Sequence, residues 1–145
     1  MARRITLGTV GPSDVAPIIT NVATPVPMSA SQVGAVAAAV VARRVCTEAV
    51  RVTGIRVALL DSGDAAEVTT VQANRIPAGS GTAAVITGSA ISLSDAGANQ
   101  TLADSAAVSQ DFEIGDTIEI EVTAAGTNAT DVSVSLVVMK LYGDA

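Results

Sequence analysis

Residues 116–126 read DTIEIEVTAAG, and this stretch decides the class of the fold. Ile118, Ile120 and Val122 alternate with Glu119 and Glu121. Because successive side chains of a β-strand point to opposite faces of the sheet, we expect the apolar residues to face a core and the two glutamates to face water. The stretch therefore predicts a strand that is buried on one face only.

The segment at residues 131–141, DVSVSLVVMKL, begins with the same alternation and then departs from it. Every second residue from 132 to 138 is apolar, which predicts a further strand with one inward face. Towards its end Val137, Met139 and Leu141 make the opposite face apolar as well. A strand that is apolar on both faces is expected to be covered on both, here by an arm of the chain or by a subunit interface.

A change of phase marks residues 49–60, AVRVTGIRVALL. Val50 and Val52 fall on one parity, whereas the apolar residues from Ile55 onward fall on the other. A β-bulge at Gly54 would return both sets to one inner face. An isolated glycine inside a strand often marks such a bulge.

The rest of the chain after residue 49 predicts short strands at regular intervals, at residues 67–76, 83–93 and 99–108. Clusters of Gly, Asp, Ser and Pro separate them and are typical of turns. Regularly spaced strands with turns between them indicate an all-β sandwich or barrel.

Residues 29–50 fit two kinds of structure. Ser29 or Ser31 could cap a helix, and the alanines that follow favour one. Gly34 and several β-branched valines favour a strand instead. The residues by themselves leave the choice open.

The first 27 residues contain four of the five prolines. Proline removes a backbone donor and pushes its neighbours towards extended conformations. The segment is also rich in Val and Ile, which a solvated disordered tail would lack. We therefore expect an extended N-terminal arm at residues 1–32, docked on its own domain, a sister subunit or another protein, and one domain at residues 33–145.

The composition excludes several classes of function. The chain has 145 residues, a net charge of −6, no histidine, one cysteine and only one Tyr and one Phe. Without histidine the commonest general base and metal ligand is missing, so we expect no enzyme activity and no cofactor. An acidic chain with so few aromatic residues is not expected to bind nucleic acid. Cys46 is expected to be a small, buried or half-buried residue rather than a nucleophile.

Acidic residues gather in two predicted loop regions: Asp61, Asp64 and Glu67, and then Asp111, Glu113 and Asp116. Their spacing lacks the alternating ligands and central glycine of an EF-hand, so we interpret them as turn and surface residues and expect no metal site. The start of the chain lacks the apolar stretch of a signal peptide, and the longest apolar run, residues 33–42, is about half a membrane helix. We expect synthesis in the cytoplasm and no membrane contact.

Three motifs together resemble a known family. An early strand carries Val-Thr-Gly at residues 52–54, a late strand begins with Gly115-Asp116 and continues with alternating apolar residues, and a final strand reads Val-x-Val-x-Leu at residues 132–136. In these motifs the chain resembles the small jelly-roll domains of tailed-bacteriophage virion proteins, of the capsid decoration and head-fibre type. The resemblance covers about residues 34–141. It implies a jelly-roll-like antiparallel β-sandwich whose first strand is residues 34–42, which favours a strand over a helix there.

The resemblance implies a structural virion protein: a capsid decoration, or cement, protein that binds and stabilises an assembled phage capsid. Its partners would be the major capsid protein and sister subunits in a homotrimer, and its location the capsid surface. A head-fibre or receptor- or glycan-binding module, or a minor tail or connector protein, remains an alternative. From the basic and apolar residues of the arm and of the last strand, we expect assembly contacts at Arg3, Arg4, Ile5, Leu7, Val137, Met139 and Leu141.

Overall fold

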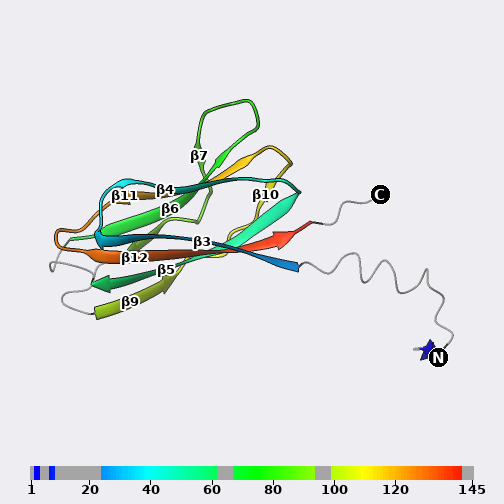
Figure 1. Cartoon of the computed structure of the whole chain (residues 1–145), viewed down its shortest axis with the longest axis horizontal. Helices are drawn as coiled ribbons and strands as arrows, with labels where there is room; N and C mark the ends of the chain where they lie inside the picture. Colours follow the sequence, from blue (N-terminus) through cyan, green and yellow to red (C-terminus); the bar gives the residue numbers. More distant parts are fainter. Residues whose placement is uncertain (1, 4–6, 9–23, 62–66, 94–98, 142–145) are drawn as a thin grey trace.

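The structure, a computed structural model, describes residues 2–3, 7–8, 24–61, 67–93 and 99–141 (Figure 1). In this part of the chain all regular elements are β-strands. In chain order they are β1 (Ala2–Arg3), β2 (Leu7–Gly8), β3 (Thr24–Ala35), β4 (Ala39–Val45), β5 (Val50–Asp61), β6 (Thr69–Ile76), β7 (Ala84–Val85), β8 (Ile91–Leu93), β9 (Asn99–Asp104), β10 (Gln110–Phe112), β11 (Thr117–Ala124) and β12 (Thr130–Lys140). Among the described residues no helix is long and apolar enough to cross a membrane.

Two five-stranded antiparallel sheets lie one above the other (Figure 1). One sheet has the order β10-β5-β12-β3, with β9 also paired to β5. The other has the order β4-β11-β6-β7, with β8 also paired to β6. We call them the β12 sheet and the β11 sheet.

The order of pairing defines the topology. The first strand of the sandwich, β3, pairs with the last, β12, and the second, β4, pairs with the one before it, β11. Further inward, β5 pairs with β9 and β10, and β6 pairs with β7 and β8. A long hairpin that is folded over itself in this way is a jelly roll. The predicted all-β, jelly-roll-like antiparallel sandwich is therefore confirmed.

The core lies between the sheets and is made by the alternation that the sequence showed. In β12 the four apolar residues at even positions from 132 to 138 are buried, and in β11 Ile118, Ile120 and Val122 are buried. Phe112 at the end of β10 is completely buried and is the largest of the fully buried side chains. Most of its neighbours in the core are Val, Ile, Leu and Ala.

The predicted bulge in β5 is confirmed. Gly54 lies opposite Val137 and Val52 lies opposite Val138, so Thr53 is the additional residue on this strand. The bulge returns the two parities to one face, because Val52 and Ile55 are both buried.

Residues 34–42 do not form the single strand that the resemblance implies. They contain the end of β3, a corner at residues 36–38 and the start of β4, and the helical alternative for residues 29–50 is wrong as well. Gly34 has a φ of +85° and lies at a register shift between the pairs Gln32–Val132 and Ala35–Thr130, just before β3 ends. At the corner the Gln32 side chain donates to the Ala37 carbonyl at 3.1 Å and accepts from the Ala37 N–H at 3.0 Å. The side-chain amide of Gln32 thus bonds the backbone at the corner where the chain passes from β3 in one sheet to β4 in the other.

The expected boundary between arm and domain, at residues 32 and 33, falls inside β3. Residues 24–35 pair with β12 along their length, so they belong to the sandwich. Pro25 and Pro27 had indicated an arm outside the sandwich, but proline is tolerated on an edge strand, and β3 lies at the edge of the β12 sheet. Residues 9–23 of the expected arm, and the predicted turn at residues 62–64, lie outside the described part of the chain.

Two other predicted strands are shorter than expected. The segment at residues 83–93 is divided into β7 and β8 at Gly88, which has a φ of +83°. There the buried Ser89 hydroxyl accepts from the Ala73 N–H and donates to the Ala73 carbonyl, which also accepts from the Ile86 N–H. The segment at residues 99–108 ends as a strand at Asp104, and the three-residue β10 was not predicted at all.

Gly115 is the glycine at which a side chain would cost most. Its φ is +95°, and a Cβ there would lie 3.2 Å from the Cβ of Ala78. We expect Gly115→Ala to lower the free energy of unfolding by about 1–3 kcal/mol, because it places an L-residue in a left-handed conformation. Urea unfolding measures this. Gly54→Ala is the control: its nearest new contacts lie at 3.9 Å, so it should stay within about 1 kcal/mol of the wild type. Equal losses in both variants would contradict the prediction.

Candidate assembly surfaces

The predicted contact residues near the N-terminus are only partly placed. Arg3 lies in β1 and Leu7 in β2, and the two residues are backbone partners in a short antiparallel pair. Arg4 and Ile5 lie outside the described residues. The backbone therefore brings Arg3 and Leu7 together.

The three predicted contact residues near the C-terminus lie in or directly after β12. Val137 points away from the core and is 51% exposed, while Met139 and Leu141 are half-buried. Leu141 also donates its backbone N–H to the Ala49 carbonyl at 2.9 Å. The face of β12 that points away from the core thus carries Val137, and within the described structure this side chain is half exposed.

Small residues surround Val137 on the outer face of the β12 sheet. The register across β3, β12 and β5 forms three successive rows: Ser31-Ser133-Ala58, Ser29-Ser135-Arg56 and Pro27-Val137-Gly54. Serine, alanine and glycine project little from a sheet. Apart from Arg56, the described side chains of these rows project little from the sheet around Val137, so another surface can approach Val137 closely.

A shallow groove of about 370 Å³ crosses the same face beside Val137. Gly54 and Ser135 leave room for it, and Ser105 and the ion pair between Arg56 and Asp104 line it. The Arg56 guanidinium donates to both carboxylate oxygens of Asp104, at 2.6 and 2.9 Å. The Ser105 hydroxyl accepts from the Ile55 N–H at 3.0 Å and donates to the Ala106 carbonyl at 2.8 Å. These groups bond one another, so their polar atoms are satisfied within the chain.

The outer face of the β11 sheet corrects one prediction. Glu119 was expected to face water, but it is only 3% exposed. Its carboxylate accepts from Arg43 Nε at 2.6 Å and from Asn74 Nδ2 at 2.8 Å. Asn74 also donates to Glu121 at 2.9 Å, and Gln72 donates to Glu121 at 3.2 Å. Polar side chains of β4, β6 and β11 thus cover Glu119 in place of water.

The charge of Glu119 is retained in this cluster. Burial disfavours its ionised form, but the hydrogen bonds from Asn74 and Arg43 and the positive charge of Arg43 outweigh that effect and hold the pKa of Glu119 below its usual value. The cluster is therefore a satisfied ionic network.

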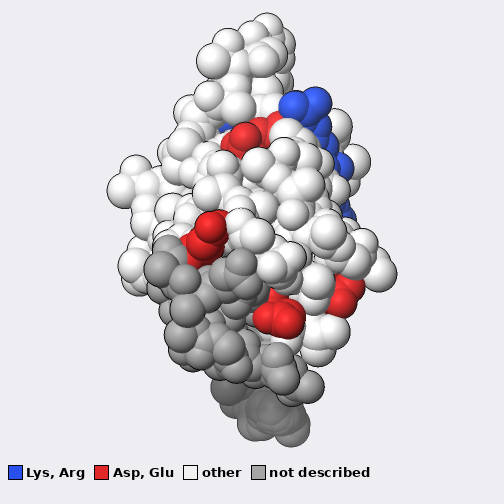
Figure 2. Space-filling view, turned by 90° about the vertical axis from the view of Figure 1, so that its left-hand side faces the viewer, with Lys and Arg blue, Asp and Glu red and all other residues white. Residues whose placement is uncertain are grey.

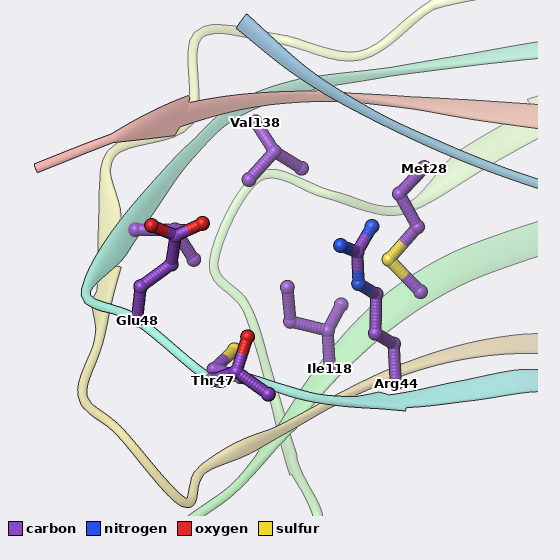
Figure 3. Close-up of a pocket in the computed structure, with 8 residues that line it drawn as sticks. Met28, Arg44, Thr47, Glu48, Ile118 and Val138 are labelled. Atoms are coloured by element: carbon purple, nitrogen blue, oxygen red, sulfur yellow. The ribbon is translucent and has the colours of Figure 1, made fainter. Parts of the chain in front are cut away.

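Cys46 lies at one end of the sandwich, where a small pocket opens between the sheets (Figure 3). Met28, Arg44, Thr47, Glu48 and Ile118 line it with Cys46, and the pocket holds about 20 Å³, the space of a single water molecule. Burial, followed by the nearby charge of Asp116, raises the pKa of the Cys46 thiol. Cys46 is buried, as predicted, and it is not held as a thiolate.

The acidic residues of the loops are dispersed among different partners. Asp111 pairs with Arg51 at 2.5 Å, and Glu67 accepts from the backbone and hydroxyl of Thr127. Asp116 accepts from two backbone N–H groups and from Arg75. Within the described residues no group of three or more His, Cys, Asp or Glu could hold a metal ion.

Comparison with known proteins adds two distant likenesses. No protein family model matches the sequence, and no curated protein matches it. Among solved structures, the chain is similar to Eiger TNF from S. frugiperda, with 11% identity and a TM-score of 0.41 over 84% of this chain and 96% of that one. It is also similar to a chain of the disulfide-linked pili of Bacillus endospore appendages, with 15% identity and a TM-score of 0.39 over 86% of this chain and 94% of that one. The jelly roll itself rests on the strand pairing described above.

Proposed function

We propose that this chain is a structural virion protein that decorates an assembled bacteriophage capsid and stabilises it. The observation that supports this most is the outer face of the β12 sheet, where the exposed Val137 lies among small residues. At the other end of β3, Val33 is 88% exposed. An exposed apolar side chain among small neighbours allows close contact with another protein surface.

In this proposal the two groups of predicted contact residues have different partners. The face with Val137, Met139 and Leu141 contacts sister subunits, which form a homotrimer. The N-terminal segment, with Arg3, Arg4, Ile5 and Leu7, anchors the trimer on the major capsid protein. A truncation that tests this anchor should end at residue 23, because removal of further residues would delete part of β3.

Val137→Asp tests the subunit contact. A carboxylate at position 137 would have to be buried on association, so we expect the trimer to dissociate at least tenfold more readily and capsid binding to weaken with it. Sedimentation equilibrium and co-sedimentation with capsids measure the two effects. Val85→Asp is the matched control, because Val85 is 55% exposed on the other sheet, and this variant should leave both unchanged. Unaltered association of Val137→Asp would exclude the face from the interface.

A further inference from the structure

The strand β4 is an open edge of the described sandwich, with one bulge at Val41 in its pairing with β11. Edge strands present unpaired backbone groups, and proteins usually shield them with short strands or prolines. On the opposite side of each sheet the outermost strands have two to six residues, and β3 carries Pro25 and Pro27. β4 has seven residues and no proline, and in the described part of the chain it pairs with β11 and no other strand.

The direction of its free backbone groups follows from one pair of hydrogen bonds. The Cys46 N–H donates to the Asp116 carbonyl at 2.7 Å, and the Gly115 N–H donates to the Cys46 carbonyl at 2.8 Å. In an antiparallel pair these directions alternate from residue to residue. The N–H and C=O of Val45, and those of Arg43 two residues earlier, therefore point away from β11 towards the open edge.

The side chains on this edge are apolar and basic. Val40 and Val45 are 42% and 57% exposed, and the Arg43 side chain is 61% exposed although it bonds Glu119. Arg44 is exposed as well, and β4 contains no acidic residue. Seen from the end of the sandwich, basic side chains lie along one upper edge of the described surface, with acidic side chains directly beside them and at several other places (Figure 2).

These charges disfavour a second copy of the same edge as the occupant. Two copies of β4 could pair antiparallel about a two-fold axis through residue 43 or through residue 44, so that the outward groups of Arg43 and Val45 are bonded. The first arrangement places Arg43 opposite Arg43, and the second places Arg44 opposite Arg44. Like charges directly opposite one another destabilise a strand pair. A strand with acidic residues has the opposite effect, as β11 illustrates on the other side of β4, where Glu119 lies opposite Arg43.

We propose that the open edge of β4 takes up an extended segment of a partner protein as an additional strand, and that this segment alternates apolar and acidic residues. Its backbone bonds the outward groups of Val45 and Arg43, and its carboxylates lie on the outer face of the β11 sheet, beside the exposed side chain of Arg43. Its apolar residues lie on the opposite face of the added strand, on the same side as Ala42. The inference goes beyond capsid decoration and does not depend on it.

A titration followed by nuclear magnetic resonance tests this site without a capsid. The probe is a blocked peptide with the sequence of β11, TIEIEVTA, because this strand already has the required alternation. We expect saturable changes at the amides of Arg43 and Val45, slower hydrogen exchange there, and unchanged amides in β11. The peptide TIKIKVTA should bind at least tenfold more weakly. Changes at Ile118 and Ile120, equal binding of both peptides, or no binding would overturn the proposal.

Two substitutions at one position separate backbone from side chain. Val45→Pro removes only the outward N–H, so the β4-β11 ladder is retained, and we expect at least a tenfold loss of TIEIEVTA binding. Val45→Ala keeps that N–H and should lose less than about threefold. If Val45→Pro, with an unchanged thermal unfolding curve, bound the peptide as tightly as the wild type, an added strand would be excluded. If Val45→Pro did not fold, the comparison of the two peptides on the wild type would decide.

Discussion

Asp116→Asn is expected to lower the free energy of unfolding by about 3 kcal/mol at neutral pH. The Asp116 side chain is only 4% exposed, and its two carboxylate oxygens accept from Ala78 N at 2.9 Å, Glu113 N at 3.0 Å and Arg75 Nε at 2.8 Å. An amide in this place has one oxygen instead of two and would turn its own N–H groups towards donors. The loop before β11 and the contact with Arg75 would weaken together.

The loss should depend on pH in a definite direction. Burial opposes ionisation of Asp116, but the two backbone N–H groups and Arg75 outweigh it, so the pKa of Asp116 lies below its usual value. A carboxyl whose pKa is lower in the folded state stabilises the fold above its unfolded pKa of about 3.9 and loses that contribution as the pH falls through the folded pKa. Urea unfolding at pH 7 and near pH 2 should therefore show a full difference between wild type and variant at pH 7 and a much smaller one in acid.

A variant of an exposed ion pair provides the control. Asp111 bonds Arg51 on the surface, and its side chain is 52% exposed. Asp111→Asn should therefore change stability only slightly. A loss at Asp116 no larger than that at Asp111, or one that does not change with pH, would contradict the role given to the buried carboxylate.

Phe112→Ala is expected to be the most destabilising of the substitutions considered, at about 3–5 kcal/mol. Phe112 is completely buried, it lies opposite Val50 in the pairing of β10 with β5, and the Arg75 guanidinium lies 5.9 Å from its ring centroid. In a core of Val, Ile and Leu, no other side chain can fill the space of the ring. The midpoint of thermal unfolding should fall by about 10 °C for a domain of this size.

Phe112→Leu keeps most of the volume and separates packing from aromatic chemistry. We expect it to lose less than about 1.5 kcal/mol. Calorimetry on both variants measures the difference. A loss in Phe112→Ala below that of Phe112→Leu would show that the ring does not fill the core as the structure describes.

Alternation of residue type predicted the fold wherever one face of a strand is apolar and continuous. In β11 and β12 the period of two predicted which side chains are buried, and in β5 the change of phase predicted the bulge at Gly54. The burial of Glu119 was not predictable in this way. It depends on Arg43 and Asn74, which β4 and β6 place beside it through a register that no single segment contains.

The sequence predicted only part of the candidate surface around Val137. The pattern of β12 alone indicated that Val137 lies on a second apolar face. The small residues beside it include Ser29 on β3 and Gly54 on β5, which lie far from Val137 in the sequence. Pro25 and Pro27 indicated an arm because proline lacks a backbone donor, but an edge strand does not need every donor. The short β10 was missed because three residues are too few to show a period.

The central claim, decoration of a capsid, is tested most directly by mixing the purified full-length chain with shells assembled from the major capsid protein of the same genome. Cryo-electron microscopy of these shells, with and without the chain, measures where it binds and how many copies bind. The proposal predicts saturable, symmetric occupancy of the outer surface by trimers and a higher unfolding temperature of the shell. Bare shells at saturating concentrations of a folded chain, or density at a single vertex only, would contradict it.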